Sequence, residues 1–454
     1  MHLMAEEFDY VILGGGVTGL AAASQLGDSA VVLEQADRPG GLVRVDCHDG
    51  FWFDHVLHLL HFPDGKAEAL VRSLFDQHQD LARCPPFAWV QTEAGLTRYP
   101  FQTHLYPLDR ETVVRCLLDF IKAKQKLGST VPQNFEDWLL LTFGKEMCRV
   151  FMLPYNRKVW KRPLDTLAPA GFTWTIAAPG LESVIRGALD PNASYRAYNE
   201  NAWYPRPEPG ASLRGMEVLS HRLARRVSQL RLGHKVIAID PKSRVVTALH
   251  NGEPLAFTFR RSCLSTLPLP LAIRICTGVP KSLDEDCRAL LSNRVVNVML
   301  SIEGARPQGC GLWRYYADEN VCFNRLVFMH EFDPLSAPPS GWGLMAEITE
   351  PSETPKSLAN RWLERARADV ERVGIMPDGC VIRNAHVRIV DPAYVVFTPA
   401  SQPVVEAARS YLEQYGIFAL GRYGRWEYSS MARNISDGVE WAESQIFVSS
   451  VRSS

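Results

Sequence analysis

The chain has 454 residues, which is more than one ordinary hydrophobic core accommodates, so two or three domains are expected. Its 49 Lys and Arg residues balance 50 Asp and Glu residues, which excludes a net field that would attract nucleic acid or a membrane surface. The 10 cysteines form no C-x-x-C pair or His/Cys cluster along the sequence, so no metal site is predicted. We find neither a signal peptide nor an apolar run long enough for a membrane span, and we therefore expect a cytoplasmic protein.

The first predicted elements are a buried strand at residues 8–13 and a helix at residues 17–26. Between and within them, Gly14, Gly16 and Gly19 form the pattern G-x-G-x-x-G. The first glycine allows a tight turn, the second lets backbone approach a pyrophosphate, and the third lets the helix pack on the strand. The phosphates would lie at the helix N-terminus, where backbone N–H groups are free. This arrangement predicts a dinucleotide-binding loop.

A second strand is predicted at residues 30–34, and its last residue is acidic. Glu34 lies about twenty residues after Gly14, where an acidic side chain accepts hydrogen bonds from the adenosine ribose. An acid there disfavours a 2′-phosphate, which leaves NAD and FAD. Arg38 and the pair Gly40 and Gly41 then offer a second stretch where backbone can pass close to phosphate and ribityl oxygens. An extended FAD gains from this second approach, whereas NAD does not require it.

The sequence GGGVTGL, the acid at Glu34 and the R-x-G-G at residues 38–41 resemble the amino-terminal signature of a large FAD family. That family includes amine oxidases, protoporphyrinogen oxidase, phytoene desaturase and UDP-galactopyranose mutase. The resemblance implies an α/β fold, with a Rossmann-type FAD-binding domain that is discontinuous in sequence and a mixed α+β substrate domain. The FAD-binding residues that it implies in this part of the chain are Gly14, Gly16, Val17, Thr18, Gly19, Glu34, Gln35, Arg38, Gly40, Gly41 and Leu42.

Residues 53–61, FDHVLHLLH, resemble a G-x-H-x-x-H segment that lies beside the flavin in the mutase branch of this family. The resemblance makes His58 the expected neighbour of the isoalloxazine ring. Val56 and Leu57 fill positions that usually hold small residues, so their bulk would narrow or reshape the cavity next to the ring.

Two mid-chain segments also resemble the mutase branch, namely residues 98–106, RYPFQTHLY, and residues 151–167, which contain P-Y-x-x-K-x-W. In the second segment Trp160 corresponds to an aromatic residue that lines the nucleotide-sugar site. The mutases bind the substrate diphosphate with two arginines, and the first is absent here, where residues 174–182 read WTIAAPGLE. Arg325, in the sequence CFNRLVF, corresponds to the second.

One arginine of two would leave a diphosphate under-neutralised unless another cation reaches in. Arg157 and Arg206 are the candidates for that cation.

Before the return of the FAD-binding pattern, residues 113–128 predict an amphipathic helix, because Arg and Lys residues interrupt its apolar face.

The FAD-binding pattern returns with strands at residues 234–240 and 244–249, and with a strand that runs into a Pro-rich exit at residues 262–270. By the resemblance, the backbone of Val236 contacts the adenine. The domains are accordingly expected as FAD-binding segments at 1–88, 215–274 and 400–454, with substrate segments at 89–214 and 275–399.

The last matching block, residues 416–443, reads as a short strand, a glycine-rich turn and a helix. Gly421 and Arg422 would place a backbone amide and a cation near the pyrophosphate. Tyr428 and Met431 match a Tyr and a Met of the mutase branch, in which the backbone at the Met faces the flavin pyrimidine. Ala432 stands where that branch has an Asp, and a backbone contact survives this change.

We predict an FAD-dependent oxidoreductase that transfers hydride to flavin N5 from a C–H bond next to nitrogen or oxygen in a polar metabolite, sugar- or nucleotide-linked molecules included. The alternative is a redox-neutral mutase, in which a nucleotide sugar rearranges at reduced flavin N5. A third possibility is a protein without activity whose FAD is structural or lost, given the residues at Val56, Leu57 and Ala178. The candidate catalytic residues are His58, Arg325, Tyr428 and Trp160. The expected partner is a small-molecule substrate, and monomer and homodimer both remain open.

Overall fold

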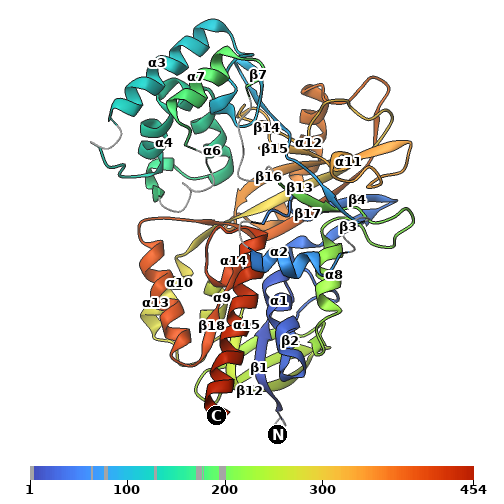
Figure 1. The fold of residues 1–454 in the computed structure, drawn as a ribbon, viewed down its shortest axis with the longest axis vertical. Coiled ribbons are helices and arrows are strands. Elements are labelled where there is room, and N and C mark those ends of the chain that lie inside the picture. The colour runs from blue at the N-terminus through green and yellow to red at the C-terminus, as the bar shows by residue number, and fades with distance from the viewer. Residues whose placement is uncertain are drawn as a thin grey trace.

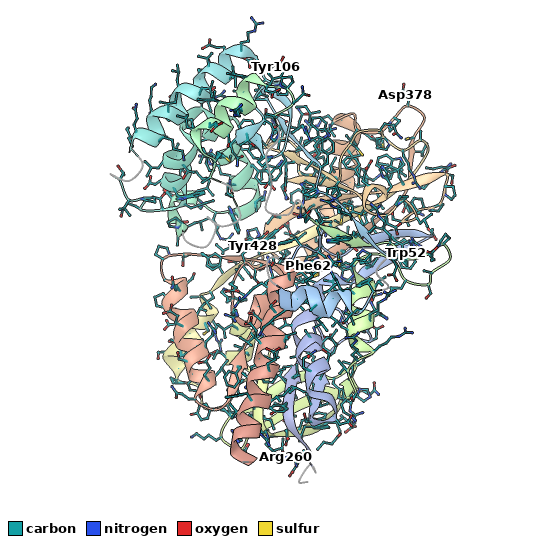
Figure 2. All side chains as sticks on the ribbon, in the orientation of Figure 1. Trp52, Phe62, Tyr106, Arg260, Asp378 and Tyr428 are labelled. Atoms are coloured by element: carbon teal, nitrogen blue, oxygen red, sulfur yellow. The ribbon has the colours of Figure 1, made fainter. Side chains whose placement is uncertain are left out.

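The computed structural model describes residues 5–62, 65–75, 80–126, 130–169, 176, 178–193 and 201–453. These residues form two large sheets that lie one above the other in Figure 1, each with its own helices. Figure 2 places Tyr428 at the level where the two halves meet. In the described part of the chain, no helix has the length and apolar character needed to cross a membrane.

The first sheet has the strand order β10-β11-β12-β1-β2-β9, and β18 pairs with β12. The strand bounds are β1 (Glu6–Leu13), β2 (Ala30–Leu33), β9 (Leu230–Arg231), β10 (Lys235–Asp240), β11 (Val245–His250), β12 (Glu253–Ser265) and β18 (Ile417–Ala419). β1 runs parallel to both β12 and β2, and β18 runs parallel to β12. The sheet is thus assembled from segments that lie far apart in the sequence.

Helices cover the first sheet on both faces. They are α1 (Val17–Leu26), α8 (Glu217–Ala224) and α15 (Met431–Ser453) on one side, with α9 (Leu269–Arg274), α10 (Lys281–Arg288) and α13 (Ser401–Glu413) on the other. Alternate β1 residues face the two layers, since Tyr10 and Ile12 pack with α1 and α15 while Val11 and Leu13 pack with α9 and α13. A strand covered on both faces needs a continuous apolar sequence, as the buried residues 10–13 have.

The second sheet has the order β17-β13-β16-β15-β14-β6-β7. Its strands are β6 (Ala88–Thr92), β7 (Gly95–Arg98), β13 (Leu291–Glu303), β14 (Trp313–Tyr316), β15 (Arg325–Phe328), β16 (Gly341–Pro351) and β17 (Val381–Val396). The first half of the chain adds a helical cluster of α3 (Arg110–Lys126), α4 (Phe135–Phe143), α5 (Lys145–Met147), α6 (Leu153–Trp160) and α7 (Leu181–Leu189), at the upper left of Figure 1. α12 (Arg361–Arg372) packs its buried Ala366 and Val370 against the other side of the sheet.

Several smaller helices and strands lie between these elements. They are α2 (Gly65–Arg72), α11 (Met329–Phe332), α14 (Gly421–Gly424), the hairpin of β3 (Val45–His48) with β4 (Phe51–Asp54), and the pair of β5 (Leu81–Arg83) with β8 (Trp203–Pro205). The predicted α/β fold class is confirmed, including the discontinuous Rossmann-type unit. The amphipathic helix expected at residues 113–128 is α3, which ends at Lys126. Residues 127 and 128 of the expected range lie outside the described part.

Candidate functional site

A cavity of about 440 Å³ opens at the carboxyl ends of β1 and β2, beside the first residues of α1 and α15. We call it the glycine-lined cavity. Its lining includes many of the predicted cofactor residues, namely Gly14, Gly16, Val17, Thr18, Glu34, Gln35, Gly40, Gly41, Leu42, Gly421, Arg422 and Met431. The N-termini of two helices therefore meet one cavity, which favours an anionic group there.

Backbone forms much of the wall of this cavity, because its two glycine stretches lie side by side. The Gly40 N–H donates to the Gly15 carbonyl at 2.8 Å, and Gly16 pairs with Gly40 in a short parallel bridge. Gly14 has a φ of 105°, which only glycine adopts readily. A Cβ built on Gly16 would meet no atom within 4 Å, so a side chain there would extend into open space. A pyrophosphate that approaches backbone needs a wall of this kind, and the residues present therefore fit FAD.

Glu34 is held at the cavity wall by three donors. Its carboxylate accepts the Gly15 N–H at 2.7 Å and the Ala36 N–H at 2.9 Å, and it pairs with Arg44 at 3.0 Å. Glu34 is buried, yet it lines the cavity, so part of its acceptor capacity faces the space where a ribose would bind. The carboxylate also fixes the glycine turn, a contact that the sequence did not indicate.

Glu34→Ala is expected to weaken FAD binding by about 1–3 kcal/mol, because a buried charge-assisted hydrogen bond is lost and the Gly15 N–H loses its acceptor. The measurement is a titration of the apoprotein with FAD, followed by flavin fluorescence. Glu7→Ala, on the exposed part of β1, serves as the control. An unchanged affinity for the Glu34 variant would contradict the assigned role.

Three predicted cofactor residues do not line the glycine-lined cavity. Gly19 lies inside α1, where a Cβ would come within 2.1 Å of the Gly14 carbonyl oxygen, so its lack of a side chain lets helix and strand pack. Arg38 turns instead toward two acids, with ion-pair distances of 3.6 Å to Asp46 and 3.4 Å to Glu217. Val236 lies on β10, where it pairs with β11 at the edge of the sheet.

A second cavity of about 240 Å³ adjoins the first, and the two share His58, Leu42, Arg422, Tyr423, Ser429 and Met431. We call it the histidine-lined cavity. Val56 and Leu57 line it, as expected from their place beside His58. His58 Nδ1 lies 2.9 Å from the Val56 carbonyl oxygen. Burial, assisted by the nearby Arg422, lowers the pKa of His58 to about 4, so the imidazole is neutral at physiological pH.

His58→Gln is expected to flatten the dependence of stability on pH between about 4 and 6.5. In that range the unfolded chain binds a proton at this position and the folded chain does not, so stability rises with pH. The shift from 6.5 to about 4 corresponds to about 3 kcal/mol across the window. Unfolding in urea at several pH values measures it. A variant that keeps the wild-type pH slope would contradict the burial of a neutral His58.

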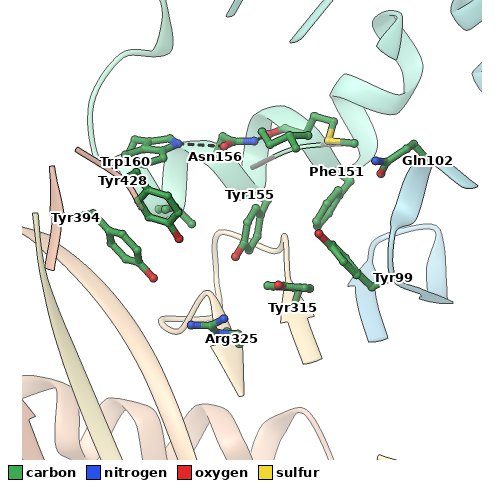
Figure 3. A pocket seen from close by; sticks show the side chains of 13 residues that line it. Tyr99, Gln102, Phe151, Tyr155, Asn156, Trp160, Tyr315, Arg325, Tyr394 and Tyr428 are labelled. Carbon is green, nitrogen blue, oxygen red and sulfur yellow. Dashed lines mark hydrogen bonds between the residues drawn. The ribbon is translucent and has the colours of Figure 1, made fainter. Parts of the chain in front are cut away.

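A third cavity, of about 150 Å³, lies under α6 and shares Tyr99, Tyr315, Arg325, Tyr394 and Tyr428 with the histidine-lined cavity. We call it the tyrosine-lined cavity, and Tyr155, Phe151 and Trp160 complete its aromatic wall. Tyr428 stacks on Tyr394 at 5.7 Å, and Arg422 lies 4.3 Å above the Tyr428 ring. Figure 3 shows the hydroxyl groups of Tyr155, Tyr394 and Tyr428 directed toward Arg325. The structure thus brings Trp160, Arg325 and Tyr428 to one cavity, with His58 in the adjoining one.

Arg325, at the start of β15, is paired with a buried acid. Glu347 on the neighbouring β16 accepts from Arg325, and also from Asn324 and from the Tyr394 hydroxyl at 3.1 Å each. Burial by itself would lower the pKa of Arg325, but Glu347 holds it well above its ordinary value. The arginine is therefore charged, and its charge is balanced before any substrate arrives.

The sequence interpretation overlooked Glu347 and the tyrosines Tyr99, Tyr155, Tyr315 and Tyr394. A signal was available for Glu347, because it directly follows the apolar residues 341–346 of β16, a strand whose first ten residues are buried, and a carboxylate in such a strand requires a partner. Tyr155 lies within the P-Y-x-x-K-x-W pattern. Tyr99 lies within residues 98–106, the other segment that resembles the mutase branch. Tyr315 and Tyr394 had no distinctive spacing, because they come from β14 and β17.

The candidates for a second substrate cation do not lie at these cavities. Arg157 is half exposed and lies 3.9 Å from Glu136, and Arg206 donates to the backbone carbonyls of Glu331 and Phe332. That expectation was wrong, because both guanidinium groups are directed to other acceptors. Within residues 174–182, the structure does not describe Trp174, Thr175 and Ala177. Ile176, which it does describe, lines the tyrosine-lined cavity.

Residues 17–303, more than half of the chain, match the family of flavin-containing amine oxidoreductases. The fold is similar to that of reduced UDP-galactopyranose mutase, with a TM-score of 0.87 and 21% identity over 97% of this chain and 96% of that one. It is also similar to a provisional protoporphyrinogen oxidase from Exiguobacterium sp. 255-15, with a TM-score of 0.68 and 16% identity over 97% and 99% of the chains. The fold is similar as well to that of cyclohexylamine oxidase from Brevibacterium oxydans IH-35A, with a TM-score of 0.64 and 16% identity over 96% of this chain and 98% of that one. FAD is the cofactor, as the sequence predicted.

Proposed function

Because this chain belongs to the flavin-containing amine oxidoreductases, we propose that it is an FAD-dependent oxidoreductase that oxidises a C–H bond next to nitrogen or oxygen in a polar metabolite. Bound FAD supplies the acceptor for the hydride. The glycine-lined cavity would hold its pyrophosphate, and the histidine-lined cavity would hold its ring beside His58. The tyrosine-lined cavity would then hold the substrate.

The observation that carries this proposal is the balance of charge around the tyrosine-lined cavity. Among the described residues that line it and the adjoining cavity, the permanent cations are Arg325 and Arg422. Arg325 is neutralised by Glu347. Arg422 donates to the carbonyls of Ser429 and Ala393, and it also lines the glycine-lined cavity, where the FAD pyrophosphate would use its charge. A diphosphate needs cations whose charge is not already balanced. The site is therefore better suited to a substrate without a diphosphate.

The side chains have distinct roles under this proposal. Tyrosine hydroxyls accept and donate hydrogen bonds, so Tyr155, Tyr394 and Tyr428 would orient polar groups of a ring-shaped substrate. The tyrosine rings and Trp160 exclude water from the reacting carbon. A neutral His58 can accept a proton from a substrate N–H or O–H, and its low pKa makes it a weak base that relies on position.

The test of this proposal is the reaction of the reduced protein with oxygen. The flavin is reduced anaerobically, mixed with air-saturated buffer and followed by the return of its absorbance, with free FAD as the control. Reoxidation within seconds is the expected result, and peroxide formation then provides an assay for screening amines and alcohols. Reduced flavin that persists for minutes would contradict an oxidase and would favour either a mutase-like enzyme that works in the reduced state or a dehydrogenase with another electron acceptor.

A second candidate function is a redox-neutral mutase that acts on a nucleotide sugar. The specific observation in its favour is that Trp160 and Arg325, which the sequence resemblance assigns to the nucleotide sugar and its diphosphate, line one cavity together with Tyr428. The likeness in fold to reduced UDP-galactopyranose mutase is consistent with it. Its test is incubation of the reduced protein with UDP-galactopyranose, followed by chromatography for the ring-contracted sugar. No conversion by reduced protein that contains stoichiometric FAD would exclude this activity.

A further inference from the structure

Three potential metal ligands come together near α11, on a part of the second sheet away from the cavities described above. Cys310 lies in the connection between β13 and β14, and His330 and Glu331 lie on α11. Figure 1 shows α11 on the opposite side of the molecule from the helical cluster of α3, α4, α6 and α7. None of the three residues is among those that line the glycine-lined, histidine-lined or tyrosine-lined cavities.

The separations between their ligand atoms suit a single ion. Cys310 Sγ lies 3.4 Å from Glu331 Oε1 and 3.9 Å from His330 Nε2, and the latter two atoms are 3.6 Å apart. Metal–ligand bonds to zinc measure about 2.0–2.3 Å, which at tetrahedral angles places the ligands roughly 3.3–3.8 Å from one another. The three atoms could therefore bind one ion with only small adjustments.

We propose that Cys310, His330 and Glu331 form a binding site for a divalent transition metal of the zinc class. One thiolate and one carboxylate balance the charge of the ion, and the thiolate and imidazole select zinc over magnesium or calcium. Three protein ligands leave the fourth position to water. The ion would tie the connection before β14 to α11 and so stabilise this end of the second sheet.

The surroundings allow an ion to enter and to be held. Cys310 and His330 are buried, whereas the Glu331 side chain is 35% exposed, so solvent reaches the cluster from that side. Arg206 and Arg306 lie nearby, but their guanidinium groups donate to backbone carbonyls. Burial raises the pKa of the Cys310 thiol, and the nearby carboxylate of Glu331 raises it further. The thiol is therefore protonated without a metal, and metal binding displaces this proton.

Sequence inspection did not predict this site because nineteen residues separate Cys310 from His330, and the hairpin of β14 and β15 brings them together. The proposal does not depend on the proposed function, since a metal at α11 would form in an oxidase and in a mutase alike.

The experiment is a titration of the flavin-containing protein with Co²⁺ after chelator treatment, followed by the red absorption bands of tetrahedral cobalt. Oxidised flavin does not absorb in that region, so the two signals are separate. We expect one equivalent of tetrahedral Co²⁺, displaced by Zn²⁺, and a rise in unfolding temperature when zinc is added. The variants are Cys310→Ser and His330→Gln, each checked for flavin content without metal.

Cys287→Ser is the matched control, because Cys287 is also buried but lies on α10 beneath the first sheet. We expect this control to bind Co²⁺ like the wild type, Cys310→Ser to lose the red bands, and His330→Gln to bind at least about tenfold more weakly. Wild-type protein without stoichiometric tetrahedral cobalt would overturn the proposal. Wild-type affinity and spectrum in either ligand variant would overturn it as well.

Discussion

Gly16→Val is expected to abolish FAD binding and to leave the fold intact. Gly16 caps the N-terminus of α1 with φ near −78°, a conformation that valine adopts without strain. A Cβ there meets no protein atom within 4 Å, so the added methyl groups would occupy the space where the pyrophosphate must approach the backbone. We expect FAD affinity to fall by at least roughly 100-fold, or about 2.7 kcal/mol.

The structure offers a closely matched control for this variant. Gly180 caps the N-terminus of α7 with φ −72° and ψ 159°, and a Cβ there also meets nothing within 4 Å. Gly180→Val should therefore purify with wild-type flavin content. The measurements are the flavin-to-protein absorbance ratio and circular dichroism of both variants. A folded Gly16→Val protein that retains stoichiometric flavin would contradict the placement of FAD at this loop.

Glu347→Ala is expected to destabilise the protein by about 3–5 kcal/mol, because it leaves the buried Arg325 without its counter-charge. The Glu347 side chain is 1% exposed, and the neighbouring Asn324 and Tyr394 would lose their acceptor too. Equilibrium unfolding in denaturant measures this effect, and FAD content reports whether the first sheet is intact.

Glu347→Gln provides a milder variant should the alanine variant fail to fold. It keeps the shape and an acceptor oxygen but removes the charge, so we expect a smaller loss of the same sign. Glu182→Ala is the control, because the Glu182–Arg186 pair on α7 is largely exposed and should contribute less than about 1 kcal/mol. A Glu347→Ala variant within 1 kcal/mol of wild type would show that Arg325 finds other compensation.

The glycine-lined cavity could be anticipated from the sequence to a large extent. Gly14, Gly16, Glu34 and Gly40 lie within one stretch of strand, turn and helix, where spacing and turn chemistry fix the geometry locally. The exception is instructive, because Arg38 lies in the same stretch and yet turns away from the cavity. Its direction is set by Glu217, which lies far along the chain on α8.

The substrate side could be anticipated only in part. Trp160, Arg325 and Tyr428 were selected because each lies in a recognisable segment, and the structure does gather them. Their environment depends on strand register, however. β15 pairs Arg325 directly with Glu347 of β16, and this one register decides that the cavity has a compensated cation instead of a free one.

By itself, the sequence determined the strand, glycine turn and helix of a dinucleotide-binding unit, because contiguous residues specify these elements. The discontinuous arrangement of that unit and FAD as its cofactor followed from the resemblance of the sequence to a known family. The tertiary structure alone decided that Glu347 balances Arg325 at the tyrosine-lined cavity, which tyrosines line that cavity, and that Cys310, His330 and Glu331 form a cluster. Those features arise where residues from distant segments meet, and a single sequence does not specify which side chain faces which across strands that are far apart in the chain.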